Sequence, residues 1–128
     1  MTWKVALVPA LACGLAAACV GIGVVRAQTK APAAYWVTET LEVSDPAALL
    51  NVIKSVPGTI QAFGGHYVAL GGRIAPGEGA PPRRITIVAF ESLERAQQWF
   101  DSAAAVAART EAQKYAKIRS YFVEGVAN

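Results

Sequence analysis

Cysteine and histidine are scarce in this chain of 128 residues, which has two cysteines and one histidine. Cys13 and Cys19 both lie in an apolar N-terminal stretch, so the sequence that follows contains no thiol. That part can form no disulfide and has no thiolate to serve as a nucleophile or a metal ligand. With His66 as its single imidazole, it also lacks the nitrogen and sulfur ligands of a usual zinc site. The composition therefore predicts no metal, and no motif calls for a cofactor.

Charged residues are also few, at 16% of the chain, and neither sign dominates. The formal net charge is +3, but Lys4 and Arg26 belong to the first 27 residues. Without these two of the twelve basic residues, the remainder carries ten basic against nine acidic residues, a net charge of +1. The basic character is thus largely a property of the N-terminal segment. A net charge of +1 does not indicate a basic surface that binds nucleic acid, so we expect no nucleic-acid partner.

Residues 5–25 form a run without charge, preceded by Lys4 and followed by Arg26, and the segment ends in Val25-Arg26-Ala27. A basic N-terminus, an apolar stretch and small residues before a cleavage site are typical of an export signal. We therefore predict a signal peptide over residues 1–27 and a periplasmic or secreted mature protein that starts near Gln28. The alternative is a retained anchor with the domain facing outward, because about 20 apolar residues can span a bilayer. A membrane is an expected partner only in that case.

The segment 28–34 is typical of a tether, and residues 35–43 alternate with the period of a strand. Tyr35, Val37, Leu41 and Val43 share one face, and Trp36, Thr38, Thr40 and Glu42 share the other. Ser44-Asp45-Pro46 predicts the cap and first residue of a helix that reaches Phe63, which Pro57 kinks or restarts. Gly64-Gly65 follows where a helix needs a left-handed residue at its end.

The second half of the chain repeats this order. Short strands are predicted at 66–70, ended by Gly71-Gly72, and at 83–90, with a loop at 73–82 between them. Ser92 is placed to cap a helix that begins at Leu93 and has an apolar stripe through Trp99 to Ala103. A last strand is predicted at 117–125. Strand, helix, strand, strand, helix, strand is the order of a ferredoxin-like βαββαβ sandwich of the α+β class.

Helices of such a fold cover one face of the sheet. We expect Trp36 and one of Tyr121 and Phe122 on the other face, where large apolar side chains favour a partner. Two sheets packed back to back would cover them, so we predict a homodimer that encloses a cavity.

Candidate functional residues are few. The glycine pairs lack the spacing and the Lys-Ser/Thr of a phosphate loop, so turns explain them better. Glu39 lies among apolar residues and is either paired with an arginine or held for proton chemistry. His66 and Glu39 are the candidate catalytic residues, and a structural role is the alternative for both. Trp36, Tyr67 and Arg84 are candidate ligand-binding residues, between the helices and the sheet or in a dimer cavity, because a few polar groups meet apolar walls there.

The stretches FGGHYVALGGR, RRITIVAFESLERAQQWFDS and YFVEG resemble the DUF1330 family of domains of unknown function over residues 35–126. The resemblance implies a dimeric α+β barrel related in shape to small cofactor-free monooxygenases and lactone isomerases, and it implies no established reaction. The motif residues that it matches as structural positions are Gly64, Gly65, Gly71, Gly72 and Trp99. Leu70 and Ala89 stand where an arginine and a glutamate are common in the family, which removes charged groups.

Two functions follow as hypotheses. The first is an exported dimeric module that binds a small molecule or serves a structural role. The alternative is a cofactor-free enzyme, similar to the monooxygenases or isomerases, that acts on a small metabolite and uses His66 or Glu39 as acid or base.

Overall fold

The structure is a computed structural model and describes residues 31–127. Its elements are β1 (Ala34–Val43), α1 (Pro46–Ile53), α2 (Val56–Ala62), β2 (His66–Leu70), β3 (Arg84–Phe90), α3 (Leu93–Phe100), α4 (Ala103–Ala112) and β4 (Ala116–Glu124). The predicted signal peptide and the first residues of the tether lie outside the described residues. Within residues 31–127, no helix is both long enough and apolar enough to cross a membrane.

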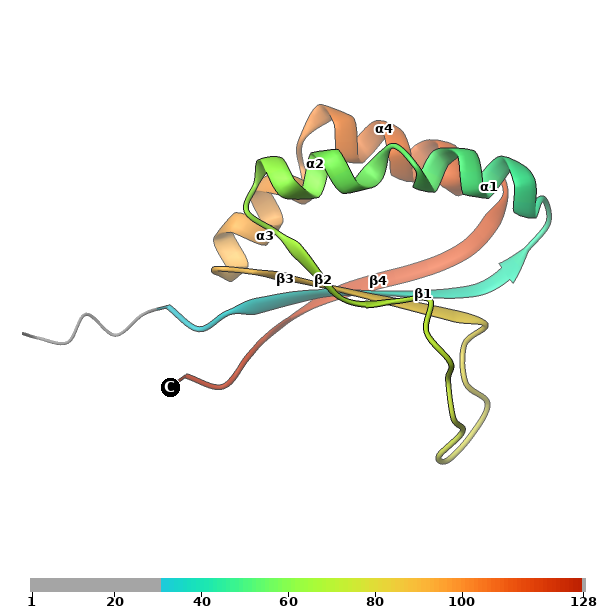
Figure 1. The fold of residues 1–128 in the computed structure, drawn as a ribbon, viewed down its shortest axis with the longest axis horizontal. Coiled ribbons are helices and arrows are strands. Elements are labelled where there is room, and N and C mark those ends of the chain that lie inside the picture. The colour runs from blue at the N-terminus through green and yellow to red at the C-terminus, as the bar shows by residue number, and fades with distance from the viewer. Residues whose placement is uncertain (1–30, 128) are drawn as a thin grey trace, which may run out of the picture.

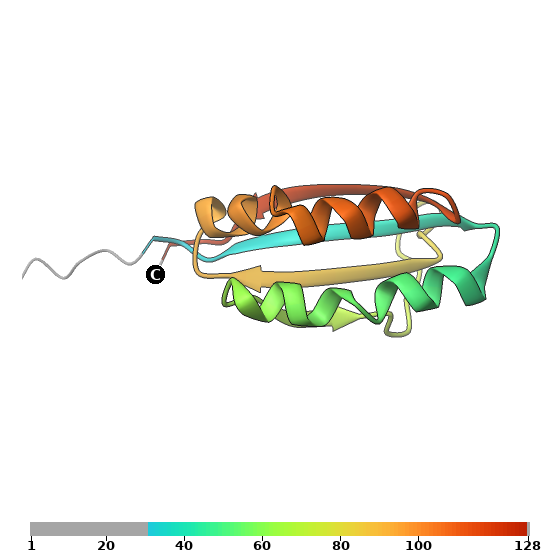
Figure 2. The ribbon, with the colours of Figure 1, turned by 90° about the horizontal axis from the view of Figure 1, so that it is seen from above.

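The four strands form one antiparallel sheet in the order β2-β3-β1-β4. All four helices lie on one face of this sheet, with α1 and α2 side by side with α4 (Figures 1 and 2). Two strand–helix–strand halves with this strand order make the ferredoxin-like α+β fold, as the sequence predicted. Within residues 31–127 the other face of the sheet, which we call the bare face, carries no helix. The segment between β2 and β3 extends away from the sheet on that side (Figure 1).

The first helical region begins and restarts where the sequence indicated. Asp45 Oδ1 accepts a hydrogen bond from the Ala48 N–H at 3.0 Å, which caps α1 ahead of Pro46. The helix ends at Ile53, and Pro57 lies in the first turn of α2, where its missing N–H costs nothing. Gly64 follows α2 with a φ of 74°, the left-handed conformation that glycine adopts without strain.

The second helical region differs from the prediction of one continuous helix. Ser92 Oγ accepts from the Arg95 N–H and caps α3 as expected, but α3 ends at Phe100. Ser102 Oγ then accepts from the Ala105 N–H at 3.4 Å and starts α4. The predicted apolar stripe therefore crosses a break between two helices, because a serine that can cap a new helix ends the first one there.

The prediction for Trp36 was wrong, because Trp36 lies on the face of the sheet that the helices cover. Its ring meets Trp99 of α3 edge to face, with 4.9 Å between the centroids. Phe122 lies on the same side against Phe100, and Tyr121 points to the bare face. Both faces of β1 carry apolar side chains, so the alternation shows which residues share a face but not which face receives the helices.

Candidate functional site

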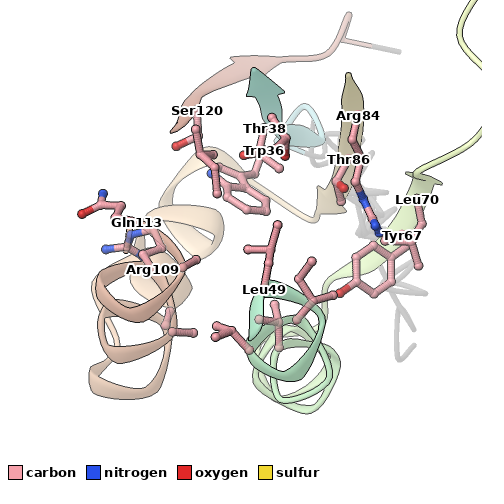
Figure 3. Close-up of a pocket in the computed structure, with 18 of the residues that line it drawn as sticks. Trp36, Thr38, Leu49, Tyr67, Leu70, Arg84, Thr86, Arg109, Gln113 and Ser120 are labelled. Carbon is pink, nitrogen blue, oxygen red and sulfur yellow. The ribbon is translucent and has the colours of Figure 1, made fainter. Parts of the chain in front are cut away.

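A pocket of about 130 Å³ lies between the helices and the sheet and is partly open to solvent (Figure 3). The helices contribute aliphatic side chains to it, and the sheet contributes residues of all four strands. Its apolar walls are Trp36, Leu49, Val52, Ile53, Val56, Leu70, Trp99, Ala105, Ala108, Ala112 and Ile118. A cavity of about 150 Å³ with apolar walls holds one benzene ring, so this pocket fits a ligand of that size.

Polar groups line the sheet side and the rim of the pocket. Thr38 and Thr40 project from β1 beside Trp36, since alternate residues of a strand share a face, and Thr86 lies on β3. Tyr67 and Arg84 stand at the β2 and β3 side, and Arg109 and Gln113 at the α4 side (Figure 3). Among the described residues that line the pocket there is no carboxylate, imidazole, thiol or lysine. The ionisable groups of this lining are therefore the Tyr67 phenol and the guanidinium groups of Arg84 and Arg109.

Tyr67 and Arg84 form one end of the pocket. The Arg84 side chain runs along β3 toward the Tyr67 ring (Figure 3). Burial raises the pKa of the Tyr67 hydroxyl, and the positive charge of Arg84 only partly opposes this effect. The hydroxyl is therefore protonated at neutral pH and can donate a hydrogen bond. Both groups at this end are hydrogen-bond donors toward the pocket.

Arg109 is held in place by its neighbours on the opposite side. Its Nη1 donates to the Phe100 carbonyl oxygen at 2.6 Å, and its guanidinium carbon lies 3.4 Å from the centre of the Phe100 ring. Burial lowers the pKa of this guanidinium, which Asp101 partly offsets. Since one donor is used and the ring covers one face, Arg109 has less freedom than Arg84 to bind a ligand.

The two tryptophans of the pocket wall differ in their hydrogen bonds. Trp99 Nε1 donates to Thr59 Oγ1 at 3.0 Å. Trp36 Nε1 is buried and has no hydrogen-bond partner among the described residues. An unpaired buried donor costs about 1–3 kcal/mol, so the Trp36 indole is less favourably placed than that of Trp99.

The structure brings three of the predicted site residues to this pocket, namely Trp36, Tyr67 and Arg84. It does not bring Glu39 or His66 there, because both belong to the bare face of the sheet. His66 is exposed at the start of β2, beside Tyr35 and Ala89. In residues 31–127, no three side chains of the His, Cys, Asp and Glu types gather as a metal site would require.

Glu39 has the paired state that the sequence left open as one alternative. It lies opposite Arg119 across β1 and β4, and its carboxylate is bound by two nitrogens, Nε at 2.6 Å and Nη2 at 3.2 Å. The hydrogen bonds from Arg119 hold the pKa of Glu39 below its usual value, although partial burial acts in the opposite direction. A carboxylate stabilised in this way is a poor proton acceptor at neutral pH.

This pair predicts a pH dependence of stability. Because the pKa of Glu39 is lower in the folded than in the unfolded chain, its contribution is complete above the unfolded pKa and is lost as the pH falls through the folded one. We expect wild type to be more stable than Glu39→Gln at pH 7 and the difference to shrink as the pH falls below the usual pKa of a glutamate. Urea unfolding of both proteins across this range measures it, and a constant difference would contradict the assignment.

The glycine pairs act as backbone elements. Gly64 and Gly71 have φ values of 74° and 61° at the ends of α2 and β2. At Gly65, a Cβ atom would lie 2.6 Å from the Phe90 ring and 2.7 Å from Ile60. Gly65 therefore permits the chain to pass close to the core.

Sequence reasoning missed the threonines and the α4 side of the pocket. Thr38 and Thr40 share the face of Trp36 by strand alternation, so the signal was present once Trp36 was placed correctly. Arg109 and Gln113 carried no such signal, because their position depends on how α4 packs against the sheet.

The fold is similar to solved structures at low sequence identity. A hypothetical protein from Arabidopsis thaliana is 15% identical, with a TM-score of 0.56 over 78% of this chain and 93% of that one. SnoaB, a cofactor-independent oxygenase from Streptomyces nogalater, is 10% identical, with a TM-score of 0.54 over 77% and 97%. A protein of unknown function from Rhodopseudomonas palustris is 12% identical, with a TM-score of 0.53 over 76% and 85%. At these identities the likeness shows the fold alone.

A comparison with curated proteins finds no significant match. The family model described as domain of unknown function (DUF1330) matches residues 33–126, which include every strand and helix of the structure and all the residues of the pocket. The chain therefore belongs to the DUF1330 family.

Proposed function

We propose that this protein is an exported, dimeric module that binds a small molecule between the helices and the sheet. The observation that carries the proposal is the pocket itself, which has apolar walls, the volume of one ring and a few polar groups at its edge. This combination is typical of a small-ligand site. Protein interiors are closely packed, so a space of this size between the helices and the sheet supports a ligand site over a purely structural role.

Binding is favoured over catalysis by the chemistry of the lining. General acid–base catalysis needs a group that exchanges a proton near neutral pH. The described lining has guanidinium groups and a phenol whose pKa is raised, while Glu39 and His66 lie on the other face of the sheet. The likeness to a cofactor-independent oxygenase concerns the fold, so it supplies no reacting group here.

A neutral probe tests the pocket. We expect benzamide to raise the melting temperature in a saturable way, because a ligand that binds only the folded state stabilises it. Ala108→Trp fills the pocket from α4 and should abolish this shift. Ala107→Trp places the same side chain on the exposed side of α4 and should preserve it. Equal loss in both variants, or no shift in wild type, would reject the pocket as a binding site.

The bare face of the sheet supports a homodimer. Val68, Tyr121 and Val123 lie on it with 56, 47 and 49% of their surface exposed. A second copy packed on this face would cover them and give the apolar contact that a stable interface needs.

We expect light scattering at micromolar concentration to give the mass of a dimer. Val123→Lys should shift the protein toward the monomer, because it places a charge on the bare face. Val106→Lys changes an exposed apolar residue of α4 on the helical side and should leave the dimer intact. A monomeric wild type would exclude this part of the proposal.

The proposed periplasmic or secreted location rests on the sequence of residues 1–27, which has a basic residue, an apolar run and Val25-Arg26-Ala27. Mass spectrometry of the protein from its native host should find a chain that starts near Gln28 in the periplasmic or secreted fraction. A chain that retains Met1 in the membrane fraction would favour the anchor instead.

A further inference from the structure

We infer that the ligand of this pocket is a single-ring carboxylate, with its ring on the apolar walls and its carboxylate on Arg84 and Tyr67. The inference rests on the proposed binding function and adds the chemical class of the ligand. It depends on three features of the pocket: an unpaired cation at its rim, the room made for that cation, and the shape of the apolar interior.

Arg84 has no carboxylate partner among the described residues. The two ion pairs in that part of the chain are Lys114 with Glu111 and Arg119 with Glu39. The Arg84 side chain is half-buried, and it lies beside Tyr67 and Leu70 at the edge of the pocket (Figure 3). A guanidinium next to apolar surface interacts more strongly with an anion than one in bulk water. This cation is therefore available for an anionic group that enters the pocket.

The backbone after β2 makes room for the Arg84 side chain. Gly71 has a φ of 61°, and a Cβ atom there would lie 3.1 Å from the guanidinium carbon of Arg84. The absence of a side chain at Gly71 lets the guanidinium rest against the chain. The neutral hydroxyl of Tyr67 adds a second donor at the same end, because a phenol is protonated at neutral pH and burial raises the pKa of this one further.

The interior of the pocket determines the rest of the ligand. Trp36 offers an aromatic surface on the sheet side, and Leu49 and Val56 lie across from it on the helices. About 130 Å³ is room for one ring, with the charged group at the end formed by Arg84 and Tyr67.

A carboxylate fits the rim better than a phosphate. The planar guanidinium binds a carboxylate through two parallel hydrogen bonds, and the single negative charge matches the one cation at the Tyr67 end of the pocket. Arg109, the other cation of the pocket, already donates to the Phe100 carbonyl oxygen. A doubly charged phosphate held by Arg84 alone would therefore remain partly uncompensated at this end of the pocket.

Benzoate and benzamide test the inference, because they have the same shape and differ in charge. We expect the full-length wild type to bind benzoate about 10-fold more tightly than benzamide in calorimetric titrations, as a hydrogen bond to a charged group is stronger than a neutral one. Arg84→Met should remove this preference and change benzamide affinity by less than about twofold. Arg83→Met is the matched control, since Arg83 is exposed, lies outside the pocket and carries the same charge.

The outcomes separate this inference from the proposed function. If benzamide binds and benzoate binds no more tightly, the ligand class is wrong and the binding module stands. If Arg84→Met weakens both probes equally, Arg84 supports the pocket structurally and the inference is overturned. If inorganic phosphate displaces benzoate at a similar concentration, the rim binds anions in general and the assignment to a carboxylate fails. If neither probe binds wild type, both proposals fail together.

Discussion

Replacing Trp99 by alanine is expected to lower the free energy of unfolding by about 4 kcal/mol, since loss of a buried tryptophan typically costs about 3–5 kcal/mol. Trp99 is 2% exposed and packs against Trp36, Phe90 and Phe100, with centroid distances of 4.9, 5.5 and 6.3 Å. The cavity left by alanine would merge with the pocket beside it. A small domain has a total stability of about 5–15 kcal/mol, so this change removes a large part of it.

Urea unfolding at one fixed protein concentration measures the loss, because a dimer would make stability depend on concentration. Two conservative variants separate packing from hydrogen bonding. Trp99→Phe breaks the bond to Thr59 Oγ1, whereas Trp36→Phe removes an N–H that has no partner among the described residues. We expect Trp99→Phe to be more destabilising by about 1 kcal/mol or more. Equal losses would contradict the different hydrogen bonding of the two indoles.

Gly65→Ala is expected to destabilise the fold by about 3 kcal/mol, the upper end of the usual cost of overpacking a core. The new Cβ atom would lie 2.6 Å from Phe90 and 2.7 Å from Ile60, and neither side chain has room to move. Phe90 is in turn stacked on Trp99, so displacement of its ring would disturb the wall of the pocket.

Gly72→Ala is the control for this substitution, because a Cβ atom there meets no heavy atom within 4 Å. Its effect should stay within about 0.5 kcal/mol, as for other surface changes. Thermal or urea unfolding of the two variants side by side gives the comparison. Similar losses for both would show that the glycine pairs serve chain flexibility and that the close approach at Gly65 is unimportant.

The order of the elements and the fold class could be predicted from local patterns. These patterns each depend on a short segment of the chain. They are the strand alternation in residues 35–43, the helix caps Asp45 and Ser92, and the left-handed glycines at 64 and 71. These signals do not need the rest of the fold. The break at Ser102 was also a local signal, but the apolar residues on both sides of it suggested a continuous stripe.

The side of the sheet that faces the helices could not be predicted in the same way. Trp36 was expected on the bare face, together with Thr38 and Thr40, which share its face of the strand. In the structure these threonines face the helices and line the pocket, while Glu39 on the other face is neutralised by Arg119. A polar residue that lines a pocket and a polar residue that faces water give the same alternation in the sequence, so the sequence does not distinguish them. The contribution of Arg109 from α4 likewise follows from packing between distant segments.

The central claim is that a small molecule binds between the helices and the sheet, and nuclear magnetic resonance of the ¹⁵N-labelled protein tests it most directly. Titration with benzoate should shift the indole N–H signals of Trp36 and Trp99, which both line the pocket, together with the backbone amide of Thr86. The amides of Tyr121 and Val123 report on the bare face and should change little. Saturable shifts confined to Tyr121 and Val123, or no saturable shift at the two indoles, would contradict the claim.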